Sequence, residues 1–247
     1  MRAPVYSLDQ VEELLTSVTG LEAIGSFSAM MPQVGLDFDK GRELMIVGRT
    51  TNGWGEPADG ANTQFTLAEI LEPSVRRGFS ERSLRFSDED PMHWVPGYGP
   101  RSAFWRVAKA VAGGLGIGGA DWYRRIAYTN LYKVGRADEG NPPDSVANAQ
   151  MSVCTRLLRH EITVLSPRRV LFLVGCGPDC DWFQWFQEAL SFDKAGEESG
   201  ATYTAKWGSI GQSSVVVLPH PQGKPESLLA GKAVDVFRAF GAGATAL

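Results

Sequence analysis

Three short and almost uninterrupted apolar runs constrain the fold of this chain more than any other feature. They are Glu43–Val47, Arg169–Val174 and Ser213–Leu218, and each is followed by Gly or Pro within one residue. A strand that is apolar at nearly every position is buried on both faces, as in the parallel sheet of an α/β protein. A fourth segment, Arg125–Val134, is expected to be a strand that runs into a loop.

Helical patterns alternate with these strands. Ser7–Val18 opens with a helix-start signal and continues with apolar residues at helical spacing. A long helix is predicted over Pro143–Leu165, with Asp144 as its N-cap. Further helices are expected at Thr66–Leu71, Ser102–Val111 and Asp181–Leu190 and within Pro225–Phe240, and Pro73–Pro100 is expected to be irregular. This alternation predicts an α/β protein, a three-layer α/β/α sandwich around a central, mainly parallel four-stranded sheet.

The bulk properties favour a single domain over residues 1–247, with residues 1–42 as an N-terminal helical extension packed on it. The formal net charge is −4, so no global basic field indicates nucleic acid, although a local basic patch can still contact phosphates. Three cysteines make no disulfide framework. Neither a membrane span nor a signal peptide is apparent, so we expect a cytoplasmic protein, a monomer without a membrane partner.

A polar or glycine-bearing segment follows each predicted strand. These segments are Gly48–Trp54, Thr129–Lys133, Gly175–Gly177 and Pro219–Lys224. Open parallel sheets bind ligands outside the carboxyl ends of their strands, so the four segments predict a polar site there. The alternative is that each is an ordinary turn, because Gly, Asn and Pro are common in turns.

Other motifs in the sequence are weaker indications of function. The glycines of Gly113–Gly119 resemble a dinucleotide-binding loop, but they follow a predicted helix instead of a strand. Cys176 and Cys180 are a poor zinc set without further ligands, so no metal is expected. His160 falls in the middle of a predicted helix with no visible partner.

The ordered set of strand ends resembles the uracil-DNA glycosylase superfamily, and most closely its iron–sulfur branch. The resemblance covers roughly residues 43–240. It is carried by Tyr128–Lys133, Asn141–Pro143, the helix Gln150–Leu165 that leads into the strand at Val170, and Leu218–Pro221.

The resemblance implies hydrolysis of the N-glycosidic bond of a flipped, deaminated base in DNA, with uracil as the expected base. Asn130 would read the base edge, and His220 would stabilise charge on the leaving base. The first segment would hold the attacking water through Asn52 or Thr50. The remaining implied roles are base binding by Gly48, stacking by Tyr98 or Trp54, and phosphate contacts from Arg49, Lys133 and Lys224.

This chain departs from the family pattern in three places that bear on activity. One is the loop after His220 and Pro221, which carries no apolar residue to insert into the duplex before Leu228. Another is that the iron–sulfur branch needs four cysteine ligands, which this chain does not supply. Cys154 stands at one of the expected positions, but Val134 stands at another. No cofactor is therefore expected, and Cys154 is predicted to face the core. The first segment offers Arg49 and Thr50 where an acidic residue often stands, and Glu56 is a possible substitute. An inactive nucleobase- or nucleic-acid-binding protein of the same fold therefore stays open as an alternative. So does a generic parallel-sheet protein in which the Asn and His side chains only cap turns.

Overall fold

The computed structural model of the chain describes residues 4–50, 64–84, 90–138, 140–175, 181–200 and 203–243. For residues 241–243 it describes the backbone but not the side chains. The chain divides into two compact units, each assembled from three segments of sequence. The first unit comprises Met1–Pro32, Arg49–Asp88 and Asn130–Val164, and the second comprises Gln33–Gly48, Glu89–Thr129 and Leu165–Leu247. Each unit is described by itself.

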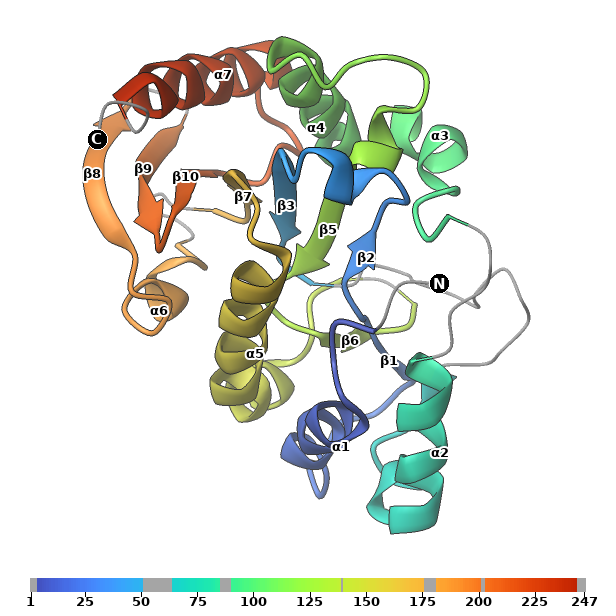
Figure 1. The fold of residues 1–247 in the computed structure, drawn as a ribbon. Helices are drawn as coiled ribbons and strands as arrows, with labels where there is room; N and C mark the ends of the chain where they lie inside the picture. The colour runs from blue at the N-terminus through green and yellow to red at the C-terminus, as the bar shows by residue number, and fades with distance from the viewer. Residues whose placement is uncertain are drawn as a thin grey trace. The chain divides into compact units, whose positions relative to one another are not determined.

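The described elements follow one another as a mixture of helices and strands (Figure 1). In chain order they are α1 (Leu8–Ser17), β1 (Phe27–Ala29), β2 (Gln33–Val34), η1 (Phe38–Lys40), β3 (Leu44–Gly48), β4 (Gln64–Phe65), η2 (Glu69–Leu71), α2 (Pro73–Ser83), α3 (Val95–Tyr98), η3 (Gly99–Arg101), α4 (Ala103–Gly114), η4 (Trp122–Arg125), β5 (Ile126–Asn130), β6 (Val134–Arg136), α5 (Asp144–Leu165), β7 (Arg169–Leu173), α6 (Gln184–Gln187), β8 (Asp193–Ser199), β9 (Thr204–Ile210), β10 (Ser213–Leu218) and α7 (Glu226–Gly243). The coarse prediction of a mixed α/β protein is confirmed.

A mixed sheet of seven strands forms the centre of the second unit, in the order β2-β5-β3-β7-β10-β9-β8. Its middle strands β3, β7 and β10 are parallel to one another, whereas β9 and β8 extend the sheet as antiparallel strands. The side chains of β3 are all buried, and those of β7 and β10 nearly all. The apolar runs therefore form the middle of the sheet, as the sequence predicts.

Helices α4 and α7 pack together in the second unit, and α7 also contacts β10 (Figure 1). The buried face of α4 carries Phe104, Val107, Ala108 and Val111, the residues that share one face in the sequence pattern. Gly114 allows the close approach, because a Cβ there would lie 2.5 Å from a methyl carbon of Val234.

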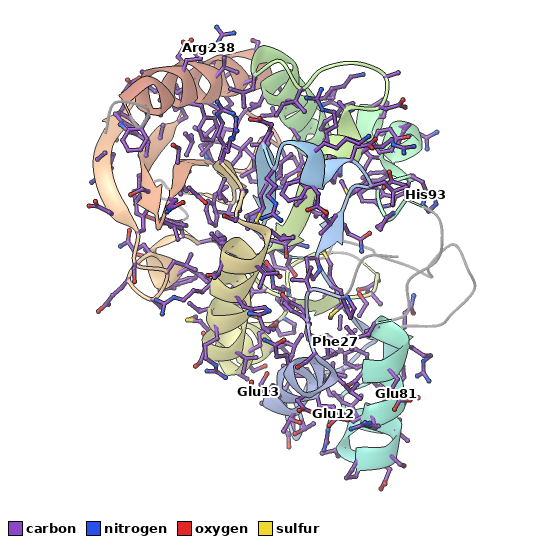
Figure 2. The ribbon with its side chains drawn as sticks, viewed as in Figure 1. Glu12, Glu13, Phe27, Glu81, His93 and Arg238 are labelled. Atoms are coloured by element: carbon purple, nitrogen blue, oxygen red, sulfur yellow. The ribbon has the colours of Figure 1, made fainter. Side chains whose placement is uncertain are left out.

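A small sheet in the order β4-β1-β6 lies in the first unit together with α1 and α2. Helix α1 begins as predicted, with Ser7 accepting from the Gln10 backbone in a capping box. Arg77 of α2 links the two helices through Glu12 of α1, at 3.1 Å, and also pairs with Glu81 of its own helix. Figure 2 labels Glu12 and Glu81 on these two helices.

Several sequence predictions need correction. The predicted four-stranded sheet has seven strands, because β2, β8 and β9 were missed. β8 is mostly exposed and polar, so it lacks the apolar pattern that identifies a strand. The β8–β9 pairing also needs Gly208, where a Cβ would lie 2.0 Å from the Asp193 carbonyl oxygen.

The predicted irregular stretch Pro73–Pro100 contains helices α2 and α3. Pro73 starts α2 and Glu72 caps it, which are local signals that outweigh its weak apolar pattern. Residues 1–42, expected to be a helical extension, hold strands β1 and β2 as well as α1. Within the described residues, every helix is too short or too polar to cross a bilayer.

Candidate functional site

The carboxyl ends of three parallel strands meet at one edge of the large sheet. β3 and β7 stay in register up to Val47 and Phe172, and β7 and β10 stay paired up to Leu173 and Leu218. The backbone amides of residues 174 and 175 both donate to the carbonyl of Leu218, at 3.2 and 3.1 Å. The segments that begin at Gly48, Gly175 and Pro219 therefore leave the sheet at the same edge.

His220 lies two residues beyond β10 and is partly exposed. The backbone N–H of Gln222 donates to its Nδ1 over 3.4 Å, a long contact made by the tight turn after Pro221. An Nδ1 that accepts a hydrogen bond leaves the proton of a neutral imidazole on Nε2. His220 in its neutral form is therefore a hydrogen-bond donor through Nε2.

An aromatic cluster adjoins His220 in the second unit. The Phe104 ring lies 6.1 Å from the His220 ring between centroids, and Phe104 in turn contacts Trp105 and Tyr128. These three aromatic side chains are buried, so their first role is packing. Tyr98 of α3 is 49% exposed. Its ring contacts Trp94, which in turn contacts Trp105 and Tyr128, so Tyr98 joins this cluster to the surface.

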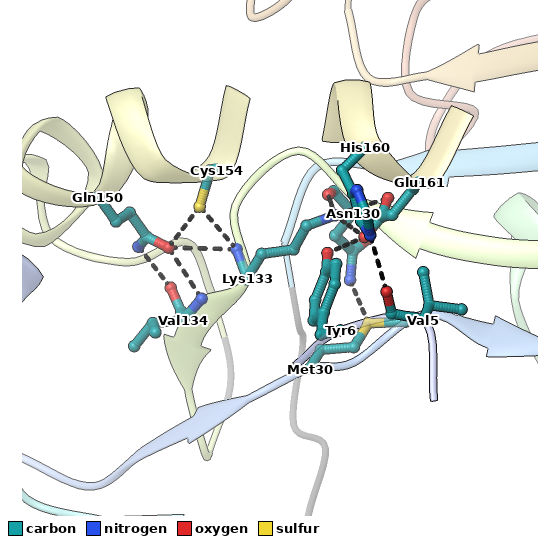
Figure 3. A network of polar contacts seen from close by, with 10 residues as sticks. All are labelled: Val5, Tyr6, Met30, Asn130, Lys133, Val134, Gln150, Cys154, His160 and Glu161. Carbon is teal, nitrogen blue, oxygen red and sulfur yellow. Dashed lines mark hydrogen bonds and ion pairs between the residues drawn. The ribbon is translucent and has the colours of Figure 1, made fainter. Parts of the chain in front are cut away.

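A second polar group, in the first unit, is a buried chain of side chains that runs from Tyr6 through Glu161 and Lys133 to the backbone of Asn130 (Figure 3). The Tyr6 hydroxyl donates to the Glu161 carboxylate, and the Lys133 ammonium lies 2.8 Å from Glu161 Oε1. The same ammonium donates to the Asn130 carbonyl oxygen at 2.6 Å. Lys133 and Glu161 are both completely buried. We call Tyr6, Glu161, Lys133 and Asn130 the buried polar chain.

Asn130 itself, the last residue of β5, is fully buried. Its side-chain amide donates to the sulfur of Met30 at 2.7 Å. A thioether is a weak acceptor, so a stronger acceptor could replace the sulfur in this contact.

Gln150 and Cys154 of α5 hold the chain just after Lys133. Gln150 Oε1 accepts from the amides of Lys133 and Val134, and its Nε2 donates to the Val134 carbonyl at 2.7 Å. The Cys154 thiol donates to Gln150 Oε1 at 3.1 Å. Burial raises the pKa of the Cys154 thiol to about 12, against the effect of the nearby Lys133 charge.

This donor set does not suit an iron–sulfur cluster. A cluster ligand must be a thiolate, whereas Cys154 is held as a thiol with an amide oxygen as its acceptor. Among the described residues, no group of three or more His, Cys, Asp or Glu side chains could hold a metal ion. The prediction that Cys154 faces the core is confirmed, since its side chain is fully buried.

One prediction for an individual residue is wrong. Lys133 was expected to contact a DNA phosphate, but its ammonium is buried and paired with Glu161, out of reach of solvent. The sequence showed no partner for His160, and the structure supplies one, since its Nε2 lies 2.9 Å from the Val5 carbonyl oxygen. Both contacts join segments that are far apart in the sequence.

The remaining predicted residues lie in several environments. Gly48 is the buried last residue of β3. Arg49 and Thr50 follow it and belong to the first unit, where the Arg49 carbonyl accepts from the Tyr132 amide at 2.9 Å. The Thr50 hydroxyl is buried and finds no hydrogen-bond partner among the described residues. Lys224 is exposed. The predictions for Asn52, Trp54, Glu56, Cys176 and Cys180 lie outside the described residues.

Sequence reasoning missed Tyr6, Met30 and Gln150 as members of the polar groups. A signal for Glu161 was present, because its carboxylate falls on the apolar stripe of the predicted helix with Leu157, Leu158 and Leu165. A carboxylate at a core position requires a partner. The sequence does not say that the partner is Lys133.

No protein-family model matches this chain, and no curated protein matches it either.

Proposed function

We propose that this chain is an N-glycosidic bond hydrolase of the uracil-DNA glycosylase type, which releases uracil from DNA. The observation that carries the proposal is the state of His220 after β10. Its Nδ1 accepts the Gln222 N–H, so the neutral ring offers Nε2–H as a donor. The partly exposed ring, beside Phe104 and at an edge where three strands end, is suited to meet a ligand.

The chemistry proposed for this donor follows from the bond that breaks. When the bond between C1′ of the sugar and N1 of uracil breaks, its electron pair moves onto the base and negative charge develops on the O2 oxygen. A preorganised N–H donor at that oxygen stabilises this charge as it forms. Water supplies the hydroxyl that joins C1′ and the proton that the released base finally takes up. The Thr50 hydroxyl is buried and has no hydrogen-bond partner within the described part of the chain. This supports a role in holding that water, because such a group calls for an ordered water or ligand.

The same proposal extends to the fold and the cellular role. The α/β chain would adopt the three-layer sandwich of the superfamily. It would act as a monomer in the cytoplasm, where it would serve base-excision repair. Asn130 would read the base edge, and the half-exposed Tyr98 would stack on the flipped base. Arg49 and Lys224 would contact phosphates, without Lys133.

The test is release of free uracil from single- and double-stranded oligonucleotides that contain one uracil. We expect His220→Ala to lower kcat about 100- to 1000-fold, as for loss of one oxyanion-hole donor. His93→Ala is the matched control, since His93 is an exposed histidine of the same unit whose Nδ1 contacts the Asp90 carbonyl. If high concentrations of the wild-type protein release no uracil, or if His220→Ala is as active as His93→Ala, the proposal is wrong.

A second candidate is a protein that binds a nucleobase or nucleic acid without cleaving it. One observation favours it: Arg49 and Thr50 provide no carboxylate to activate water. This candidate predicts binding of uracil-containing DNA without turnover. Lys224→Ala should then weaken binding and reduce the slope of log affinity against log salt by about one. A salt-independent affinity would contradict phosphate contacts.

A further inference from the structure

The buried polar chain ends on the backbone of a residue that the proposed function needs. Lys133 Nζ lies 2.8 and 3.1 Å from the two oxygens of Glu161 and 2.6 Å from the Asn130 carbonyl oxygen. An ammonium has three N–H donors, so these three oxygens can occupy all of them. The Tyr6 hydroxyl donates to the same carboxylate from the segment that precedes α1 (Figure 3).

Stability alone does not explain such a chain. Apolar side chains of similar volume often stabilise a core as well as, or better than, a buried ion pair does. What apolar side chains cannot do is donate to the carbonyl at the end of β5. The particular consequence of the ion pair is therefore the fixed position of the Asn130 backbone.

The neighbouring backbone is held as firmly. The Tyr132 amide donates to the Arg49 carbonyl at 2.9 Å, and the Met30 amide donates to the Lys133 carbonyl at 2.8 Å. In contrast, the Asn130 side-chain amide donates to the weakly accepting sulfur of Met30. Asn130 thus combines a fixed backbone with a side-chain amide whose contact with the Met30 sulfur a carbonyl oxygen can replace.

We propose that Lys133, Glu161 and Tyr6 are positioning residues, which fix the Asn130 backbone so that its amide can exchange the Met30 sulfur for a ligand carbonyl. This inference rests on the proposed function for the identity of that carbonyl, which is an exocyclic oxygen of uracil. The three residues do not touch the ligand. Their contribution is a backbone position that is already correct before the base arrives.

The experiment replaces the chain by apolar side chains in the triple variant Tyr6→Phe/Lys133→Met/Glu161→Leu. This variant leaves neither a buried charge nor an unpaired hydroxyl, but the buried Asn130 carbonyl loses its Lys133 donor. We therefore expect its melting temperature to fall by only a few degrees. Without the ammonium, we expect kcat for uracil release from single-stranded DNA to fall at least about tenfold. KM should change little, because phosphate contacts supply most of the affinity. The control is Glu13→Gln/Arg156→Gln, which removes an exposed ion pair between α1 and α5.

Wild-type kcat in a stable triple variant would overturn the inference. It would show that apolar side chains can replace the buried polar chain without loss of activity, as expected if the chain only stabilises the fold. If the triple variant does not fold, Tyr6→Phe serves instead. It removes one hydroxyl, and we expect kcat to fall about two- to fivefold with KM unchanged. Wild-type kcat in that variant would contradict the proposal.

A second measurement separates this inference from the proposed function. Amide hydrogen exchange of the peptide that spans residues 126–135 should be faster in the triple variant, or in Tyr6→Phe, than in the control. If the wild-type protein releases no uracil, the proposed function fails, and hydrogen exchange alone decides the positioning role. Unchanged exchange in that peptide would refute it.

Discussion

Glu161→Gln is expected to cost this protein a large part of its stability. The substitution keeps the shape of the side chain but removes the charge that faces Lys133, and both residues have no exposed surface. The carboxylate has two oxygens that accept from Lys133 and Tyr6. The amide that replaces it has one oxygen, and an NH₂ donor stands in place of the second oxygen. Breaking a buried ion pair from one side costs about 3–5 kcal/mol, because the remaining charge stays buried without compensation.

A loss of that size is a large fraction of the roughly 5–15 kcal/mol by which proteins are stable. For a chain of this length it corresponds to a fall in melting temperature of about 6–20 °C. Urea unfolding followed by both circular dichroism and tryptophan fluorescence measures it. Glu13→Gln is the matched control, since Glu13 forms a largely exposed pair with Arg156 of the same helix α5 and should change the midpoint little. A loss below about 1 kcal/mol for Glu161→Gln would refute the reasoning that this pair is buried and charged.

Three further predictions follow from local geometry. Gly114→Ala should destabilise the protein by about 1–3 kcal/mol in urea unfolding, because its Cβ would meet Val234. At the neighbouring Gly113, an added Cβ would meet open space, so Gly113→Ala should raise the free energy of unfolding by about 0.5–1 kcal/mol. Equal effects of the two substitutions would contradict the close α4–α7 contact. Because the folded pKa of Cys154 is raised from 9.0 to about 12, its contribution to stability is complete below pH 9.0 and is lost as the pH rises towards 12. Cys154→Ala should flatten the fall in unfolding free energy over that range, and an unchanged slope would argue against a buried thiol. Ser7→Ala removes the capping box of α1 and should cost about 1 kcal/mol in the same assay, so a neutral effect would count against the cap.

The sequence determined the middle of the large sheet and most of the helices. β3, β7 and β10 could be predicted because a strand buried on both faces must be apolar at nearly every position. Helix α1 could be predicted because its cap lies within four residues of sequence. The place of His220 after β10 followed from the same local reasoning.

Only the tertiary structure decided what the polar residues do. β8 was missed because its stability comes from pairing with β9, not from an apolar face of its own. Lys133 was misjudged because a lysine in sequence looks exposed, and only the approach of α5 brings Glu161 to it. Patterns of three to five residues record local geometry, whereas Tyr6 and Glu161 are 155 residues apart, and only the folded chain brings them together.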